Sequence, residues 1–113
     1  LADKPLAFAE TGYIAQDLSV PAYNLNKQGS VTWQKDYLEK VLKLCIEKKA
    51  KLFIWFCPKD YDALINSLQN QGGVSQDVFN LLALWKDTGL IDENGAPRLA
   101  YYSWLSWMQR KKE

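Results

Sequence analysis

The first predicted element of this chain is the stretch Lys4-Pro5-Leu6-Ala7-Phe8-Ala9-Glu10-Thr11-Gly12-Tyr13. A short apolar run between a proline and a glycine predicts a β-strand over residues 5–10. Side chains alternate along a strand, so we expect Leu6, Phe8 and Glu10 on one face. Glu10 then stands at the C-terminal end of the strand, where α/β proteins assemble active sites. It is a candidate functional residue, although a strand end that reaches solvent would explain it equally well.

The next two elements complete a predicted βαβ unit. Ser30 can cap a helix over residues 31–49, in which apolar side chains recur at helical spacing. Residues 51–57 are apolar on both faces, which is typical of a buried parallel strand. The two strands are therefore predicted to be parallel neighbours, with a right-handed crossover and the helix packed across them. In that arrangement Trp55 would share a face with Glu10.

Between the first strand and this helix, residues 14–30 are predicted to form a long irregular loop. Loops of this length inside a compact unit are usually functional or disordered. Tyr13 and Tyr23 could line a binding cleft there, or could pack the loop onto its own scaffold.

The segments after the second strand are predicted to be helical. Asp60 could cap a short helix, a role that we favour over catalysis for this residue. Another helix is expected over residues 75–88, where Gly89 is a natural terminating residue. A last helix is expected over residues 97–110.

Composition limits the possible partners. The chain has 113 residues, of which 48% are hydrophobic and 24% are charged, and its formal net charge is +1. The near balance of charge argues against nucleic acid or a membrane surface as the partner. No apolar run approaches the roughly 20 residues that span a bilayer. Residues 1–113 are predicted to form a single segment of globular protein.

The chemistry is limited by the absence of histidine. This excludes Ser-His and Cys-His catalysis and removes the commonest metal ligand. Any reaction must rest on carboxylates, with Lys or Tyr as weaker options, and we expect neither a metal nor a cofactor. Cys45 and Cys57 lie in apolar surroundings without a paired spacing, which favours buried free thiols over a disulfide or a metal site. The five Trp and six Tyr residues suit either core packing or sugar stacking.

Three elements, in this order, resemble the C-terminal part of clan A glycoside hydrolases, which are retaining enzymes built on a (β/α)8 barrel. The strand that ends in Glu10-Thr11-Gly12-Tyr13 resembles their seventh strand, and the apolar strand with Trp55 resembles their eighth. The tail from Gly89 to Arg98, followed by Ala100-Tyr101-Tyr102, is similar to their usual ending. The resemblance implies that Glu10 is the nucleophile and that Trp55 floors the sugar subsite. Tyr13 and Asp60 are then further candidate substrate-binding residues.

The chain departs from this family in one respect. A retaining glycosidase needs two carboxyl groups roughly 5–5.5 Å apart, and the family's acid/base Glu follows an Asn on the fourth strand. The sequence has no Asn-Glu dipeptide, and a full barrel takes about 250 residues. The expected fold is therefore a partial (β/α)8 barrel, its last quarter, inactive alone.

The resemblance also implies partners and a location. We expect a β-linked oligo- or polysaccharide as the substrate, contact with the remainder of the barrel or self-association, and a secreted or periplasmic protein. One alternative is a non-catalytic carbohydrate-binding or scaffold module that kept the fold. Another is an unrelated small α/β interaction domain in which Glu10 is a surface acid.

Overall fold

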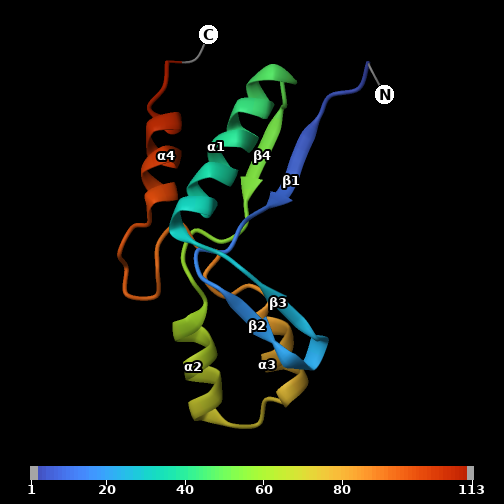
Figure 1. The fold of residues 1–113 in the computed structure, drawn as a ribbon, viewed down its shortest axis with the longest axis vertical. Helices are drawn as coiled ribbons and strands as arrows, with labels where there is room; N and C mark the ends of the chain where they lie inside the picture. The colour runs from blue at the N-terminus through green and yellow to red at the C-terminus, as the bar shows by residue number, and fades with distance from the viewer. Residues whose placement is uncertain (1–2, 112–113) are drawn as a thin grey trace.

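The computed structural model describes residues 3–111, which form a mixed α/β chain with a small parallel sheet and four α-helices (Figure 1). Strands β1 (Ala7–Thr11) and β4 (Leu52–Trp55) pair in parallel, and helix α1 (Val31–Glu47) connects them through the β2–β3 segment. Helix α4 (Leu99–Met108) packs along α1. The predicted pair of parallel strands, with a helix across it, is confirmed. Within residues 3–111 the sheet has two strands and does not close into a barrel.

The core lies between α1, β4 and α4. Helix α1 begins at the predicted cap, because the Ser30 hydroxyl accepts a hydrogen bond of 3.0 Å from the Trp33 amide. Its apolar stripe packs on the sheet and on α4, and the buried residues at this junction are Leu38, Leu42, Trp55, Leu90 and Ala100. Aromatic rings extend the core, and Phe53 lies between Phe8 and Trp104 with centroid distances of 6.3 and 5.7 Å.

The prediction of an irregular loop over residues 14–30 is wrong. This segment contains an antiparallel hairpin of β2 (Leu18–Val20) and β3 (Leu25–Lys27), joined by the short 3-10 helix η1 (Pro21–Tyr23). Asn24 takes the left-handed conformation, φ 50°, that turns the chain into β3. Three-residue strands are too short to produce a periodic apolar pattern.

Two further helices, α2 (Asp62–Gln71) and α3 (Gln76–Ala83), lie with this hairpin at the other end of the molecule (Figure 1). Helix α3 ends five residues earlier than predicted, and Gly89 does not terminate it. A Cβ at Gly89 would lie 2.6 Å from both the amide nitrogen and Oδ1 of Asp60, so glycine is needed there for close packing.

Among residues 3–111, no helix or strand covers one of the two faces of the β1–β4 sheet. Leu52 and Ile54 alternate with the buried positions of β4 and are 48% and 45% exposed. The sequence pattern predicted burial on both faces, and α1 and α4 bury only one. The side chains at the open face therefore remain available for contact with another element.

Candidate functional site

A β-bulge turns Glu10 towards the open face of the sheet. Phe8 pairs with Phe53 and Thr11 pairs with Trp55, so two residues of β1, Ala9 and Glu10, oppose the single Ile54. Paired residues in a ladder point to the same side, which places Phe8 and Thr11 with the rings under α1. Glu10 is exposed, on the side away from the helix.

The predicted common face of Leu6, Phe8 and Glu10 is therefore wrong at its last member. The side chain of Thr11 points to the side of the sheet that α1 covers, because its hydroxyl forms a hydrogen bond with the Tyr37 hydroxyl on α1. Strict alternation would have put Glu10 on the Phe8 side. The extra residue in the bulge reverses it, as bulges beside functional sites often do.

Glu10 lines an open cavity of about 650 Å³, the Glu10 cavity. Its walls come from the end of β1 and the residues after it, the β2–β3 hairpin, the residue after β4 and the segment after α3. The side chains that line it include Glu10, Tyr13, Lys27, Phe56 and Trp85. The ring centroids of Phe56 and Trp85 are 5.9 Å apart, so the two rings form one aromatic wall.

Tyr13 lines this cavity, which is one of the two roles that the sequence left open for it. Its ring packs on Tyr37 with a centroid distance of 5.3 Å, which attaches it to α1. The Lys27 ammonium of β3 lies 4.9 Å from the Tyr13 ring centroid, a cation–π contact between hairpin and β1 segment. Tyr23, the other candidate, is 48% exposed on η1 and does not line the cavity.

Trp55 lies on the other side of the sheet from Glu10, which corrects the prediction of a shared face. The indole is 7% exposed and packs in the core beside Tyr37. Its Nε1 donates a hydrogen bond of 3.1 Å to the Thr88 carbonyl. The next residue, Phe56, lines the Glu10 cavity instead, because neighbouring side chains point to opposite sides.

The sequence suggested that Asp60 caps α2, and this is wrong. The residue before the helix is Tyr61, and no side chain caps the helix start. The buried carboxylate of Asp60 instead binds Arg98 in a bidentate ion pair, with hydrogen bonds of 2.8 Å to Oδ1 and 2.6 Å to Oδ2. Oδ1 also accepts the Gly89 amide at 2.8 Å. Both oxygens are thus occupied within the protein, and the side chain is fully shielded from solvent.

Arg98 joins three segments at this point. Besides Asp60, it donates to the Gly89 carbonyl at 2.8 Å and to Asp87 at 3.1 Å. Burial alone would lower the pKa of the Arg98 guanidinium, but the hydrogen bonds and charge of Asp60, with the charge of Asp87, raise it. We call Asp60, Asp87, Gly89 and Arg98 the Arg98 node.

The Arg98 node holds the segment that forms one wall of the Glu10 cavity. Gln34 of α1 adds hydrogen bonds of 3.1 Å to the Tyr13 and Gly89 carbonyls. Thr88 and Gly89 are therefore fixed from α1, β4 and the start of α4. The Thr88 hydroxyl in turn donates a hydrogen bond to the carbonyl of Trp85, whose ring packs against Phe56.

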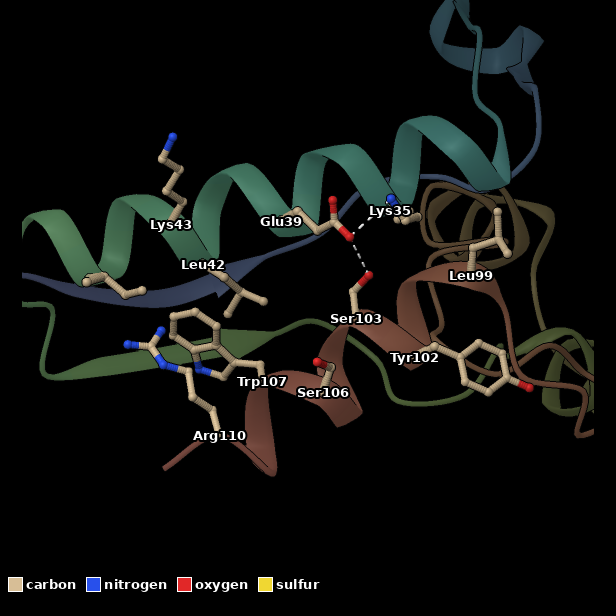
Figure 2. Close-up of a pocket in the computed structure, with 11 residues that line it drawn as sticks. Lys35, Glu39, Leu42, Lys43, Leu99, Tyr102, Ser103, Ser106, Trp107 and Arg110 are labelled. Carbon is tan, nitrogen blue, oxygen red and sulfur yellow. Dashed lines mark hydrogen bonds and ion pairs between the residues drawn. The ribbon is translucent and has the colours of Figure 1, made fainter. Parts of the chain in front are cut away.

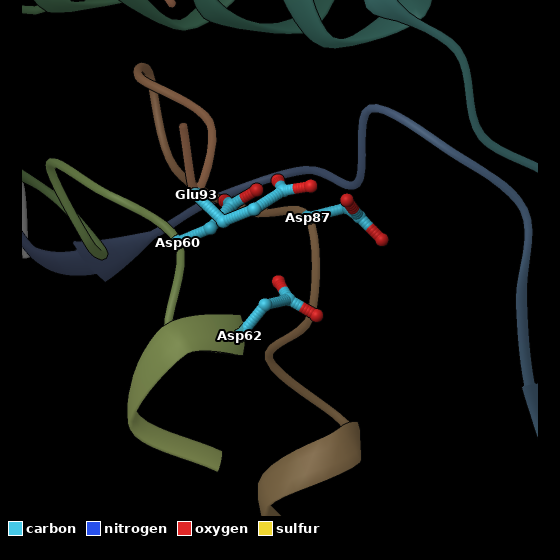
Figure 3. A group of neighbouring side chains, drawn as sticks. All are labelled: Asp60, Asp62, Asp87 and Glu93. Carbon is cyan, nitrogen blue, oxygen red and sulfur yellow. The ribbon is translucent and has the colours of Figure 1, made fainter. Parts of the chain in front are cut away.

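Four carboxylates gather around this node (Figure 3). Asp60, Asp62, Asp87 and Glu93 each place an oxygen within 4.8 Å of the others. Burial raises the pKa of the Asp62 carboxyl; Lys86 opposes this rise, and Asp60 and Glu93 add to it. Carboxylate oxygens suit hard cations, but the Arg98 guanidinium already binds two of the four. These four carboxylates are the group that could hold a cation, and in the structure Arg98 binds two of them and Lys86 lies 3.9 Å from a third, Asp62.

A second, larger cavity lies away from Glu10, between α1 and α4 (Figure 2). It has a volume of about 760 Å³. Its acidic residue, Glu39, accepts hydrogen bonds from Ser103 and Lys35, and these lower the pKa of its carboxyl. The guanidinium carbon of Arg110 lies 4.8 Å from the centroid of the Trp107 ring. The cavity lies between the two helices, which the hydrogen bond of 2.8 Å from Ser103 to Glu39 connects.

Both cysteines are free and buried, as predicted. Cys45 lies on α1 and Cys57 follows β4. Burial raises the pKa of both thiols, so each thiol is protonated at neutral pH. Neither cysteine lines the Glu10 cavity.

The sequence alone did not identify Lys27, Phe56 or Trp85. Lys27 and Trp85 reach the cavity through a hairpin and a wall segment whose positions depend on distant contacts. Phe56 carried a usable signal, because it follows Trp55 in a strand and must face the opposite side. The bulge that brings Glu10 to that side could not be predicted, because it does not change the pattern of apolar residues in the sequence.

Comparisons with known proteins give no relative for this chain. It matches no protein-family model, and searches of curated proteins and of solved structures return no significant match. Within residues 3–111, none of the helices combines the length and apolar character needed to cross a bilayer.

Proposed function

We propose that this chain is the C-terminal part of a retaining glycoside hydrolase that cleaves a β-linked oligo- or polysaccharide, with Glu10 as the nucleophile. The observation that carries the proposal is the position of Glu10. It stands at the carboxyl end of a parallel strand, on the helix-free face, beside a cavity with an aromatic wall. Sugars stack their apolar faces on such rings.

The reaction would take two steps. A Glu10 carboxylate oxygen attacks the anomeric carbon while an acid protonates the departing glycosidic oxygen, and a glycosyl ester forms. The same acid, now a base, then removes a proton from water, which attacks the anomeric carbon and releases Glu10. Among the described residues that line the cavity, Glu10 is the one carboxylate. We therefore assign the acid/base role to a residue outside this chain.

The proposed parent fold is a (β/α)8 barrel in which β1 and β4 are the last two strands. The parallel pairing, the helix between the strands and the closing helix α4 support this arrangement. The open face with Leu52 and Ile54 corresponds to a barrel interior that further strands would enclose. The radius of gyration is 16.2 Å, whereas an independent domain of this length has about 13 Å. Such an extended shape suits part of a larger unit.

A second candidate is a non-catalytic carbohydrate-binding module of the same fold. The single carboxylate in the cavity favours it, because retaining catalysis requires two. The aromatic wall would then bind sugar without turnover. This alternative and the enzyme differ in one measurable property, which is hydrolysis by the complete protein.

The test is Glu10→Gln in the complete protein. The amide is nearly isosteric but is a poor nucleophile, so we expect kcat to fall by roughly a thousand-fold or more while sugar binding persists. A fluoro-sugar that traps the glycosyl-enzyme should label Glu10 in the wild-type protein. Peptide mass spectrometry reads the labelled residue directly.

Glu47→Gln is the matched control, because Glu47 is an exposed carboxylate at the end of α1, away from the cavity. It should leave turnover and labelling unchanged. A label on another carboxylate, or near-normal turnover of Glu10→Gln, would refute Glu10 as the nucleophile. Binding of oligosaccharide without hydrolysis would favour the non-catalytic module.

A further inference from the structure

We propose that Lys27 gives the Glu10 cavity a preference for saccharides that carry a carboxylate, such as uronic-acid residues, over their neutral counterparts. This inference rests on the proposed function of the cavity as a sugar site. It assigns Lys27, on the β2–β3 hairpin, as a specificity-determining residue.

The first observation is the charge of the cavity lining. Within the part of the chain that the structure describes, Glu10 and Lys27 are the two charged side chains that line it. They form no ion pair with each other, and Lys27 takes part in none of the ion pairs found among residues 3–111. The ammonium charge is therefore not neutralised by a neighbouring carboxylate.

The second observation is that the Lys27 ammonium contacts another residue of the cavity lining. Its ammonium lies 4.9 Å from the centroid of the Tyr13 ring, and the Tyr13 ring packs on Tyr37 of α1. Its backbone pairs with Leu18 across the hairpin. A cation–π contact restrains a lysine but leaves its charge and donors available to a ligand.

These positions specify the ligand by its chemistry. An apolar sugar face fits the wall of Phe56 and Trp85. An anionic group would be repelled near Glu10 and attracted near Lys27, so the carboxylate must lie away from the reacting carbon. A hexuronic acid meets this requirement, because its carboxylate is on C6 and its glycosidic bond is on C1.

The experiment measures binding of the complete protein to an array of β-linked oligosaccharides, each present in neutral form and in C6-oxidised form. The Glu10→Gln background prevents hydrolysis during the measurement. For each oligosaccharide that binds, we expect the oxidised form to bind more tightly than the neutral form by roughly 1.5- to 5-fold at low salt, the range of an exposed charge pair. The ratio should decrease as salt concentration rises.

Substitutions of Lys27 then assign the preference. Lys27→Gln should bring the ratio of the two affinities close to one and leave neutral binding largely intact, whereas Lys27→Arg should keep the preference. Lys40→Gln removes the same charge from the exposed side of α1 and should change nothing. Circular dichroism verifies that each variant is folded.

The outcomes separate this inference from the function on which it rests. Equal binding of neutral and oxidised sugars, or a preference that survives Lys27→Gln, would overturn the role of Lys27 and leave the sugar site standing. Failure of the folded protein to bind any saccharide on the array would overturn both.

Discussion

At the scale of single residues, the ion pair of Arg98 and Asp60 has the largest energetic consequence. Both side chains are buried, 7% and 0% exposed, and they form hydrogen bonds with each other and with Gly89. Removal of one partner of such a pair leaves an uncompensated charge in the interior. The pair stabilises the cavity wall through Thr88 and Gly89, although neither charge touches the cavity.

Arg98→Met should therefore lower the free energy of unfolding by about 3–5 kcal/mol. The double variant Asp60→Leu/Arg98→Met should recover much of this loss, because the fully buried charge of Asp60 is removed together with its partner. Urea denaturation of the three proteins measures both effects. The matched control is Lys35→Met at the exposed Lys35–Glu39 pair, where the loss should stay below about 1 kcal/mol. A loss of similar size at both positions would contradict the role of the node.

At the scale of secondary structure, two irregular features set the site. The bulge in β1 turns Glu10 to the open face, and the β2–β3 hairpin brings Lys27 to the cavity. Helix α1, which follows the hairpin, carries Tyr37, which contacts Thr11 and Tyr13. The first turn of α1 carries Gln34, whose amide reaches the carbonyls of Tyr13 and Gly89. The start of this helix therefore supports both walls.

Ser30→Ala should destabilise the chain by about 1 kcal/mol, because it removes the acceptor of the Trp33 amide at the helix start. Thermal denaturation of the folded protein measures the loss. Ser67→Ala, on the exposed side of α2, removes a hydroxyl that caps nothing and should be neutral or slightly stabilising, since alanine is the better helix former. An equal loss at both positions would argue against the cap.

At the scale of the whole molecule, the regular parts of the fold follow from the sequence and the site follows only in part. The parallel strands, α1 with its Ser30 cap and the free thiols are predictable, since each depends on local periodicity or local chemistry. Glu10 and Tyr13 are predictable as residues at the end of a strand. The side on which Trp55 lies and the partner of Asp60 are not predictable, because a bulge and an arginine 38 residues away determine them.

The open sheet leads to a prediction about assembly. Leu52 and Ile54 are exposed, and each of the two strands has an unpaired edge within residues 3–111. We expect the isolated chain to self-associate, because apolar strand faces and free edges promote contact. Sedimentation of the wild-type chain and of Ile54→Lys should show less association in the variant. Leu64→Lys, at a similarly exposed leucine of α2, is the control. A monodisperse wild-type monomer would count against a missing remainder of the sheet.

The Arg98 node also determines how cooperatively the molecule unfolds. The elongated chain, 50 × 33 × 24 Å, has its main buried cluster at the end that contains α1, β4 and α4. The end with α2, α3 and the hairpin has few buried apolar side chains, so its stability comes mainly from attachment to the first end. Thr88 and Gly89 are main attachment points between the two ends. Opening of the Arg98 node would therefore release the cavity wall as one unit while the helix-covered sheet remains folded.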